Sequence, residues 1–232
     1  AFGISLFFGL VGVHWLLTLI PFDNALFSMG KFITAALAVV SGTGGLYYMI
    51  KCYRIPARPF WNHWQTATSF IGTAVSFGSI IVGTVAAFSA SSAEQLTSIL
   101  GGCLFTLAIG LLLEAVGLYS QAKCNQSASD EGAASHYVLT TTYGKTYMLR
   151  NVLLALTAIS ALLLSSLSLT ATIAASAFIV LAILAVLTIV IGRAVFYVLV
   201  IPTTMPGAFF WRNKAFEEHA KETGLVDVVD AG

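Results

Sequence analysis

Six long stretches of apolar residues limit what this chain can fold into more than any other feature of it. They lie near residues 1–20, 26–50, 67–90, 96–121, 147–168 and 172–201. Each is about as long as the roughly 20 mainly apolar residues that an α-helix needs to cross a bilayer. They are rich in Leu, Val, Ile and Ala and lack the alternation of membrane β-barrel strands. The sequence therefore predicts an all-α, polytopic transmembrane helix bundle with six spans.

The composition excludes a water-soluble domain. Of the 232 residues, 58% are hydrophobic and only 9% are charged, whereas soluble domains carry roughly 25% charged residues. One water-soluble core cannot hide this much apolar surface, so the sequence indicates an integral membrane protein surrounded by lipid. The formal net charge is +1 and no basic cluster occurs, so a nucleic-acid partner is not expected.

The prolines support these boundaries, because proline breaks the hydrogen-bond ladder of a helix. All five fall between or after the apolar stretches, at positions 21, 56, 59, 202 and 206. We therefore expect a helix bundle over residues 1–201 and a cytoplasmic tail over residues 202–232. The chain starts inside an apolar stretch, without an initiator Met or a cleavage signal. This start predicts that N-terminal helices are missing from the chain.

Basic residues are distributed unevenly between the linkers. Three linkers, at residues 21–24, 91–94 and 168–170, contain no Lys or Arg. The basic residues lie in the other linkers and in the tail, at Lys51, Arg54, Arg58, Lys123, Lys145, Arg212, Lys214 and Lys221. Because cytoplasmic loops are enriched in Lys and Arg, the sequence predicts that these segments and the C-terminus face the cytoplasm. The tyrosines also gather near that side, which favours a docking surface there.

Three charged residues lie inside the predicted spans. At about 1.5 Å per residue, Glu114, Arg150 and Arg193 reach similar depths on three successive helices. Each alone would cost several kcal/mol in lipid, so we expect the carboxylate to pair with one or both guanidinium groups. Two interpretations stay open: a clasp that sets the helix register, or the border of a cavity for a polar head group. Asn151 and Tyr197 lie near enough in the sequence to add hydrogen bonds.

The outer half of the predicted bundle contains other polar or small residues. His14 lies on the first span and Lys31 opens the second. A lone intramembrane histidine either forms a hydrogen bond with a neighbour or acts as a ligand, and both interpretations stay open. Small residues allow helices to approach closely. We expect such packing at the 41–45 stretch and at Gly72, Gly78 and Gly83.

Metal, haem and catalytic sites are not indicated. Cys52, Cys103 and Cys124 form no C-x-x-C pair. A bis-histidine haem needs two histidines at matched depth, and of four histidines only His14 is clearly inside a span. The chain also lacks a His-rich metal set, paired aspartates and a Ser/His nucleophile arrangement, so it is assigned no catalytic residue and no metal. A small-solute transporter is the alternative function, although no internal repeat or intramembrane proline supports it.

Four stretches together resemble one family. They are "YRIPARPFWNHWQTATSF" at residues 53–70, "LLLEAVGL" around Glu114, "YGKTYMLRNVLLAL" at residues 143–156 and "IGRAVFYVLVIPTTMPGAFFW" at residues 191–211. They are similar to the membrane anchor subunits of the dimethyl sulfoxide reductase family, which includes the anchors of sulfite-oxidising and related molybdoenzymes. The resemblance covers most of the chain.

The resemblance implies a function in anaerobic respiratory electron transport. It implies a complete subunit of eight helices in the bacterial inner (cytoplasmic) membrane. It also implies a complex with a molybdopterin catalytic subunit and an iron–sulfur cluster subunit. Such an anchor binds menaquinone or ubiquinone, holds no haem or metal itself, and passes electrons between the quinone pool and the iron–sulfur subunit. Dimethyl sulfoxide, sulfite and similar compounds all stay open as the terminal substrate.

Candidate site residues follow from this interpretation. Those expected to bind quinone or relay protons are His14, Glu114, Arg150, Arg193 and Tyr197. Those expected to dock the iron–sulfur subunit are Arg54, Arg58, Trp61, Trp64 and Trp211, since protein interfaces favour Trp and Arg. The aromatic residues among them have a second interpretation, as anchors at the membrane interface.

Overall fold

The computed structural model describes residues 2–21, 24–127 and 131–199, which form seven α-helices and no strand. The helices are α1 (Phe2–Leu19), α2 (Ala25–Tyr53), α3 (Trp64–Ser89), α4 (Ala93–Ser127), α5 (Glu131–Thr141), α6 (Gly144–Ser165) and α7 (Ala171–Val198). All except α5 are long and apolar enough to cross a membrane. The predicted all-α fold with six spans is confirmed, and the chain is a multi-pass membrane protein.

The structure differs from the prediction in the segment between the fourth and fifth spans. The predicted spans near 96–121 and 147–168 leave residues 122–146 as a linker. Instead, α4 continues to Ser127 and a short additional helix, α5, follows it. With 11 residues, α5 is too short to cross a bilayer. Its mixture of polar and apolar residues lacks the long apolar run that identified the spans, which is why it escaped prediction.

The chain divides into two compact units, and the first contains α1 and α2. These helices pack at a seam of small residues. A Cβ atom added to Gly3 would lie 3.0 Å from Gly45 Cα, and one added to Gly42 would lie 2.9 Å from a ring carbon of Phe7. The close packing predicted for the 41–45 stretch is therefore confirmed at Gly42 and Gly45.

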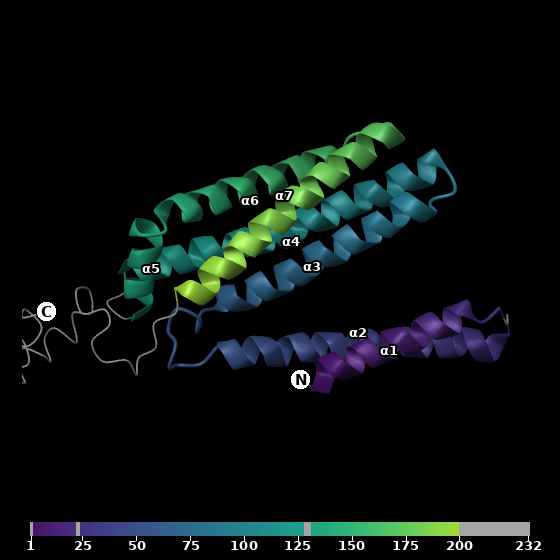
Figure 1. Cartoon of the computed structure of the whole chain (residues 1–232), viewed down its shortest axis with the longest axis horizontal. Coiled ribbons are helices and arrows are strands. Elements are labelled where there is room, and N and C mark those ends of the chain that lie inside the picture. The colour runs from purple at the N-terminus through teal and green to yellow at the C-terminus, as the bar shows by residue number, and fades with distance from the viewer. Residues whose placement is uncertain (1, 22–23, 128–130, 200–232) are drawn as a thin grey trace, which may run out of the picture. The chain divides into compact units, whose positions relative to one another are not determined.

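The second unit begins at Arg54 and contains α3 to α7. Its central helix is α4, which contacts α3, α5, α6 and α7 (Figure 1). Leu100, Leu104, Leu107 and Leu111 recur at helical spacing on α4 and are fully buried. They form the core together with residues such as Leu154, Ala161, Phe178 and Ala185 from α6 and α7. The buried stripe on α4 thus places α3, α6 and α7 around one axis.

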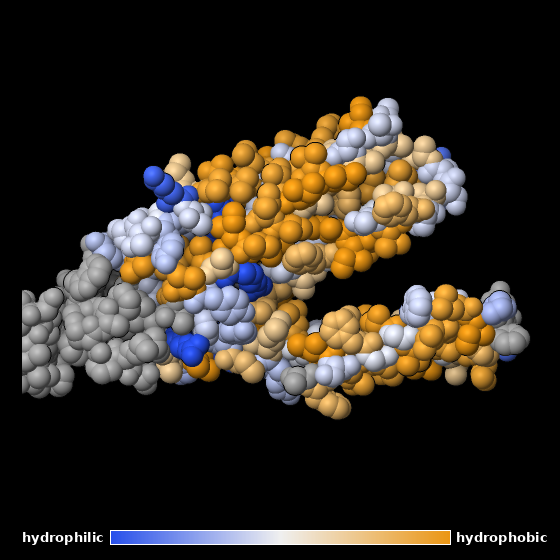
Figure 2. Space-filling view, in the orientation of Figure 1, coloured by the Kyte–Doolittle hydropathy of each residue, from blue (hydrophilic) through white to orange (hydrophobic). Residues whose placement is uncertain are grey.

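The two ends of this second unit differ in chemistry. The segment 54–63, the end of α4, α5, the start of α6 and the end of α7 meet at one end, which we call the basic end because Arg54, Arg58, Lys123 and Lys145 belong to it (Figure 1). The α3–α4 and α6–α7 turns form the opposite end, which includes Glu94. Between the ends, the sides of the unit are mainly hydrophobic (Figure 2), as expected for lipid-facing helices.

Candidate functional site

Glu114 and Arg150 come together inside the second unit, next to Gly192. A Cβ atom at Gly192 would lie 3.5 Å from Glu114 Oε1 and 3.8 Å from Arg150 Nη1. Glu114 is 3% exposed and Arg150 is 4% exposed. Because these residues come from α4, α6 and α7, the predicted match in depth between the three helices is realised. The glycine leaves the room in which the two charged side chains lie.

The polar atoms of this pair are incompletely satisfied. Glu114 Oε2 and Arg150 Nε are enclosed and have no hydrogen-bond partner among the described residues. Arg150 and Arg193 both interact electrostatically with Glu114. A buried polar atom without a partner costs about 1–3 kcal/mol, and more if it is charged. Such atoms point to a ligand or a water, and the prediction that Glu114 pairs with one or both arginines stays a prediction.

Arg193 is held by α3. Its Nη2 atom donates to Thr73 Oγ1 at 3.0 Å and to the Ser69 carbonyl oxygen at 3.3 Å. The guanidinium carbon lies 4.1 Å from the centre of the Phe70 ring, within the range of a cation–π interaction. Arg193 therefore fastens α7 to α3, in addition to its electrostatic interaction with Glu114.

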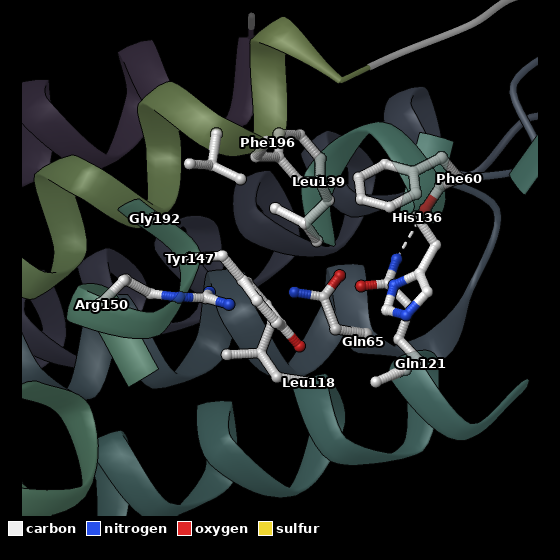
Figure 3. Close-up of a pocket in the computed structure, with 12 residues that line it drawn as sticks. Phe60, Gln65, Leu118, Gln121, His136, Leu139, Tyr147, Arg150, Gly192 and Phe196 are labelled. Atoms are coloured by element: carbon white, nitrogen blue, oxygen red, sulfur yellow. Dashed lines mark hydrogen bonds between the residues drawn. The ribbon is translucent and has the colours of Figure 1, made fainter. Parts of the chain in front are cut away.

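A small polar cavity lies beside this cluster at the basic end. Figure 3 shows Gln65, Gln121, His136, Tyr147 and Arg150 converging on it. The cavity has a volume of about 20 Å³ open to water, which is room for roughly one ordered molecule. The other residues that line it are Phe60, Leu118, Ala122, Leu139, Gly192, Val195 and Phe196.

Two glutamine side chains contribute different groups to this cavity. Gln121 Nε2 donates to the Phe60 carbonyl oxygen at 2.8 Å (Figure 3). Gln65 Oε1 is buried without a hydrogen-bond partner among the described residues. Two residues that line the cavity, Gln65 on α3 and Arg150 on α6, therefore each have a buried polar atom without a hydrogen-bond partner among the described residues. Such atoms are typical of a site that holds a polar group or an ordered water.

His136 brings a titratable group to the cavity from α5, outside the membrane-spanning helices. Its ring packs edge-on against Tyr147, with 6.5 Å between ring centres, and burial lowers the pKa of its imidazole below the usual value. A lowered pKa favours the neutral ring near pH 7, and a neutral imidazole can accept a proton. His136 lies in a segment without a span, so no pattern in the sequence indicated that it would line a cavity.

Gln65, Gln121 and Tyr147 were missed for a related reason. Each lies near the end of a span, where polar residues usually face the interface. Gln65 and Gln121 are buried and Tyr147 is partly buried, and this orientation follows only from the packing of α3 against α4 and of α5 over the bundle end. Their one signal in the sequence is that Gln65 and Tyr147 belong to the stretches that resemble the family.

His14 lies in the first unit, and its ring is bound within that unit. Its Nδ1 atom is 3.0 Å from the Lys31 carbonyl oxygen and 3.3 Å from Thr34 Oγ1. Of the two interpretations that the sequence left open, the described geometry is that of a hydrogen bond to the neighbouring helix.

Tyr197 and Trp61 pack together where α7 ends. Trp61 Nε1 donates to the Phe196 carbonyl oxygen at 2.9 Å, and its ring stacks on Phe196 with 5.1 Å between centres. The Tyr197 ring meets Trp61 edge-on at 6.1 Å and is about half exposed. Tyr197 therefore lies at the rim of the basic end, outside the set of residues that line the cavity.

The residues predicted to dock a partner have unequal exposure. Arg58 lies over the Trp61 ring at 4.6 Å, whereas Trp61 itself is buried and can act only by supporting this surface. Trp64 is 40% exposed, and its Nε1 atom donates to Ser120 Oγ at 3.1 Å. Trp211 lies outside the described residues.

Arg54 and His63 lie at the start of α3. Nδ1 of His63 accepts a hydrogen bond from the Gln65 backbone N–H at 3.1 Å and so caps the helix. Burial, and then the nearby charge of Arg54, lower the pKa of the His63 imidazole. Arg54 Nε is buried without a hydrogen-bond partner among the described residues. The prediction that Arg54 docks a partner stays a prediction.

Comparison with known proteins gives one match. A family model described as "DMSO reductase anchor subunit (DmsC)" matches residues 1–199 of the chain. No curated protein and no solved structure matches it. The matched region includes all the described residues of both units, and with them every residue of the polar cluster and the cavity.

Proposed function

This chain belongs to the family of DMSO reductase anchor subunits, and from that membership we propose that it links the membrane quinone pool to an iron–sulfur subunit of its complex. Menaquinone or ubiquinone is the proposed substrate, and no haem is proposed in this chain. A molybdopterin catalytic subunit receives or supplies the electrons on the far side of the iron–sulfur subunit. The complex resides in the bacterial inner membrane.

The observation that carries this proposal is the set of unmet polar atoms at the basic end. Glu114 Oε2, Gln65 Oε1 and Arg150 Nε are each buried and lack hydrogen-bond partners within the described part of the chain. A helix bundle that served only to hold neighbouring subunits in lipid would gain nothing from such atoms, since intramembrane polar groups are costly and mark functional sites. A quinone oxygen could accept a hydrogen bond from a donor such as Arg150 Nε. A quinol hydroxyl could donate one to an acceptor such as Gln65 Oε1 or Glu114 Oε2.

The available volume limits where the quinone ring can lie. About 20 Å³ admits a water but not a ring. We therefore propose that the ring occupies the rim of the cavity and that its oxygens reach Arg150, Gln65 or Tyr147 directly or through one water. Tyr197 does not line the cavity, but it is about half exposed at the rim of the basic end and is a further candidate to contact the ring. His14, in the first unit, remains a separate candidate for quinone binding or proton transfer.

Proton transfer has two candidate carriers in this cluster. Oxidation of a quinol releases protons, and a positioned base accelerates that step. Glu114 lies inside the bundle beside Arg150, and His136 lines the cavity from α5. We propose that a proton passes from the quinol towards the basic end through these two side chains, with a cavity water between them.

The basic end is also the proposed docking surface for the iron–sulfur subunit. Arg58 and Trp64 present a cation and an aromatic edge beside the cavity, and Trp and Arg are enriched at protein interfaces. Docking at this end would shorten the distance that electrons travel between the quinone and an iron–sulfur cluster of the partner subunit. By the distribution of Lys and Arg, this end and the C-terminal tail face the cytoplasm.

Replacement of Glu114 tests the quinone site. In membranes that contain the assembled complex, Glu114→Gln is expected to lower quinol-linked turnover by at least about tenfold, because it removes a proton acceptor. Turnover with an artificial donor that reduces the iron–sulfur subunit directly should change little. The matched control is Tyr119→Phe, which removes a polar atom from the exposed face of the same helix. Equal loss with both donors would mean that Glu114 acts only as a structural clasp.

Charge reversal at Arg58 tests the docking surface. Arg58→Glu should weaken retention of the iron–sulfur subunit on membranes by about two- to fivefold as salt is raised, the range for one partly exposed charge. Lys31→Glu is the control, because Lys31 lies near the start of α2, at the end away from the basic α2–α3 linker. Unchanged retention in Arg58→Glu across the salt series would place the docking surface elsewhere.

A further inference from the structure

A second and larger cavity lies at the end of the second unit opposite to the basic end. This cleft has a volume of about 280 Å³ and opens between the first turns of α4, the α6–α7 turn and the start of α7. It is lined by Glu94, Thr97, Ser98, Gly101, Leu104, Leu164, Leu167, Ser168, Leu169 and Ala174. None of these residues belongs to the quinone site proposed above.

The charge of the cleft selects for a cationic group. Among the described residues that line it, Glu94 is the one charged residue, and no lysine, arginine or histidine accompanies it. A free anion would meet an uncompensated carboxylate, whereas an ammonium group would gain a charge-assisted hydrogen bond. The hydroxyl groups of Ser98 and Ser168 add donors for an oxyanion that lies next to such a cation.

The polarity of the cleft changes with depth. Along α4 its lining passes from Glu94 and Ser98 to Gly101 and then to Leu104, which is buried. Ten residues of helix correspond to about 15 Å. Because Glu94 lies in the first turn of a spanning helix, this path leads from the level of the lipid head groups into the hydrocarbon. A ligand that matches it has a charged head and an apolar chain.

We propose that the cleft binds a phospholipid whose head group carries a primary amine, of the phosphatidylethanolamine type. Its ammonium group binds the Glu94 carboxylate, its phosphate accepts hydrogen bonds from Ser98 and Ser168, and one acyl chain lies along Leu104, Leu164 and Leu169. A quinone lacks the cation that Glu94 selects. The lipid site stands independently of the proposed quinone site, because the two share no residue.

Two neighbouring glycines provide a matched pair of variants. A Cβ atom at Gly101 would meet only the Ser165 carbonyl oxygen, at an ordinary contact distance of 3.8 Å, and Gly101 lines the cleft, so a leucine there is expected to extend into it. A Cβ atom at Gly102 meets nothing within 4 Å, and Gly102 does not line the cleft. Gly101→Leu therefore fills the site, whereas Gly102→Leu makes the same change one residue along the same helix.

The test is lipid retention by the whole complex. The complex is reconstituted in nanodiscs with equal amounts of phosphatidylethanolamine and phosphatidylglycerol and then partly delipidated, and the retained lipid is identified by mass spectrometry. We expect phosphatidylethanolamine to be enriched about two- to fivefold, the range for one partly exposed ion pair. Glu94→Gln should abolish the preference, Gly101→Leu should remove the retained lipid, and Gly102→Leu should keep it.

Three results would overturn the proposal. Equal retention of the two lipids by the unmodified complex would contradict the proposal that Glu94 selects the lipid with the ammonium group. Undiminished retention by Gly101→Leu would show that the lipid binds elsewhere. Recovery of quinone in place of lipid, lost in Gly101→Leu and kept in Gly102→Leu, would assign the cleft to a different ligand. Quinol-linked turnover measured in the same preparations reports separately on the site at the basic end.

Discussion

Replacement of Gly72 by leucine is expected to prevent α3 and α4 from packing and to remove most of the folded chain from the membrane. A Cβ atom at Gly72 would lie 2.5 Å from the Gly110 carbonyl oxygen and 3.4 Å from the Glu114 backbone nitrogen. Both are backbone atoms of α4, so no side chain can turn aside and the helices must separate. We expect a loss of about 3 kcal/mol or more, the upper range for overpacking a closely packed interior.

The measurement is thermal unfolding of the detergent-solubilised complex, together with the amount of chain found in membranes. Gly78→Leu is the control, because Gly78 lies on the same helix and a Cβ there meets nothing within 4 Å. It should change stability by about 0.5 kcal/mol or less, as surface substitutions do. Equal stability of Gly72→Leu and Gly78→Leu would contradict the close packing of α3 against α4 at Gly72.

Replacement of Arg150 by methionine is expected to have the second large effect. It removes a guanidinium group that interacts electrostatically with Glu114 and leaves a buried carboxylate with weaker compensation. Removing one partner of a buried charge pair typically costs about 3–5 kcal/mol. The unfolding temperature of the complex in detergent should therefore fall sharply, and Glu114→Leu made in addition should restore most of it.

The double variant separates the two interpretations of the buried charges. If Glu114 and Arg150 serve only as a clasp, Arg150→Met with Glu114→Leu should regain both stability and quinol-linked turnover. If they border the quinone site, stability should return while quinol-linked turnover stays low and turnover with the artificial donor is normal. A double variant that is as unstable as Arg150→Met alone would contradict the energetic coupling between the two residues.

Family membership also decides between the two functions that the sequence left open. A small-solute transporter was the alternative, and it rested on the intramembrane charges and glycines. The glycines instead have a packing role at Gly42, Gly45, Gly72 and Gly83, where an added Cβ would meet a neighbouring helix. Gly44 and Gly78 are the exceptions among the predicted glycines, since a Cβ at either would meet no described atom within 4 Å.

Several features of the candidate site could be predicted because they depend on position along one helix. The rise per residue placed Glu114, Arg150 and Arg193 at similar depth without any knowledge of packing. The partners of Arg193 could not be predicted in this way. Ser69 and Thr73 are more than 100 residues from it in the sequence, and only the side on which α7 meets α3 brings them within hydrogen-bond distance.

The cavity depended still more on tertiary structure. His136 reaches it from a helix that has no span-like pattern, and Gln65 and Gln121 reach it because α3 packs along α4. The cleft that includes Glu94 arises where the α6–α7 turn and the start of α4 leave a space between them. A sequence does not specify the distance between helices directly, because that distance depends on which side chains interlock.

The sequence by itself determined the number of spans among the described residues, their approximate positions, the membrane environment and the family. The cause is that lipid requires each helix to satisfy its own backbone hydrogen bonds and to be apolar over a fixed length, which are properties of consecutive residues. Tertiary structure alone decided which polar side chains meet, which of their atoms remain without partners and where space for a ligand is left. Those properties belong to residues far apart in the chain, and close packing of the helices brings them together.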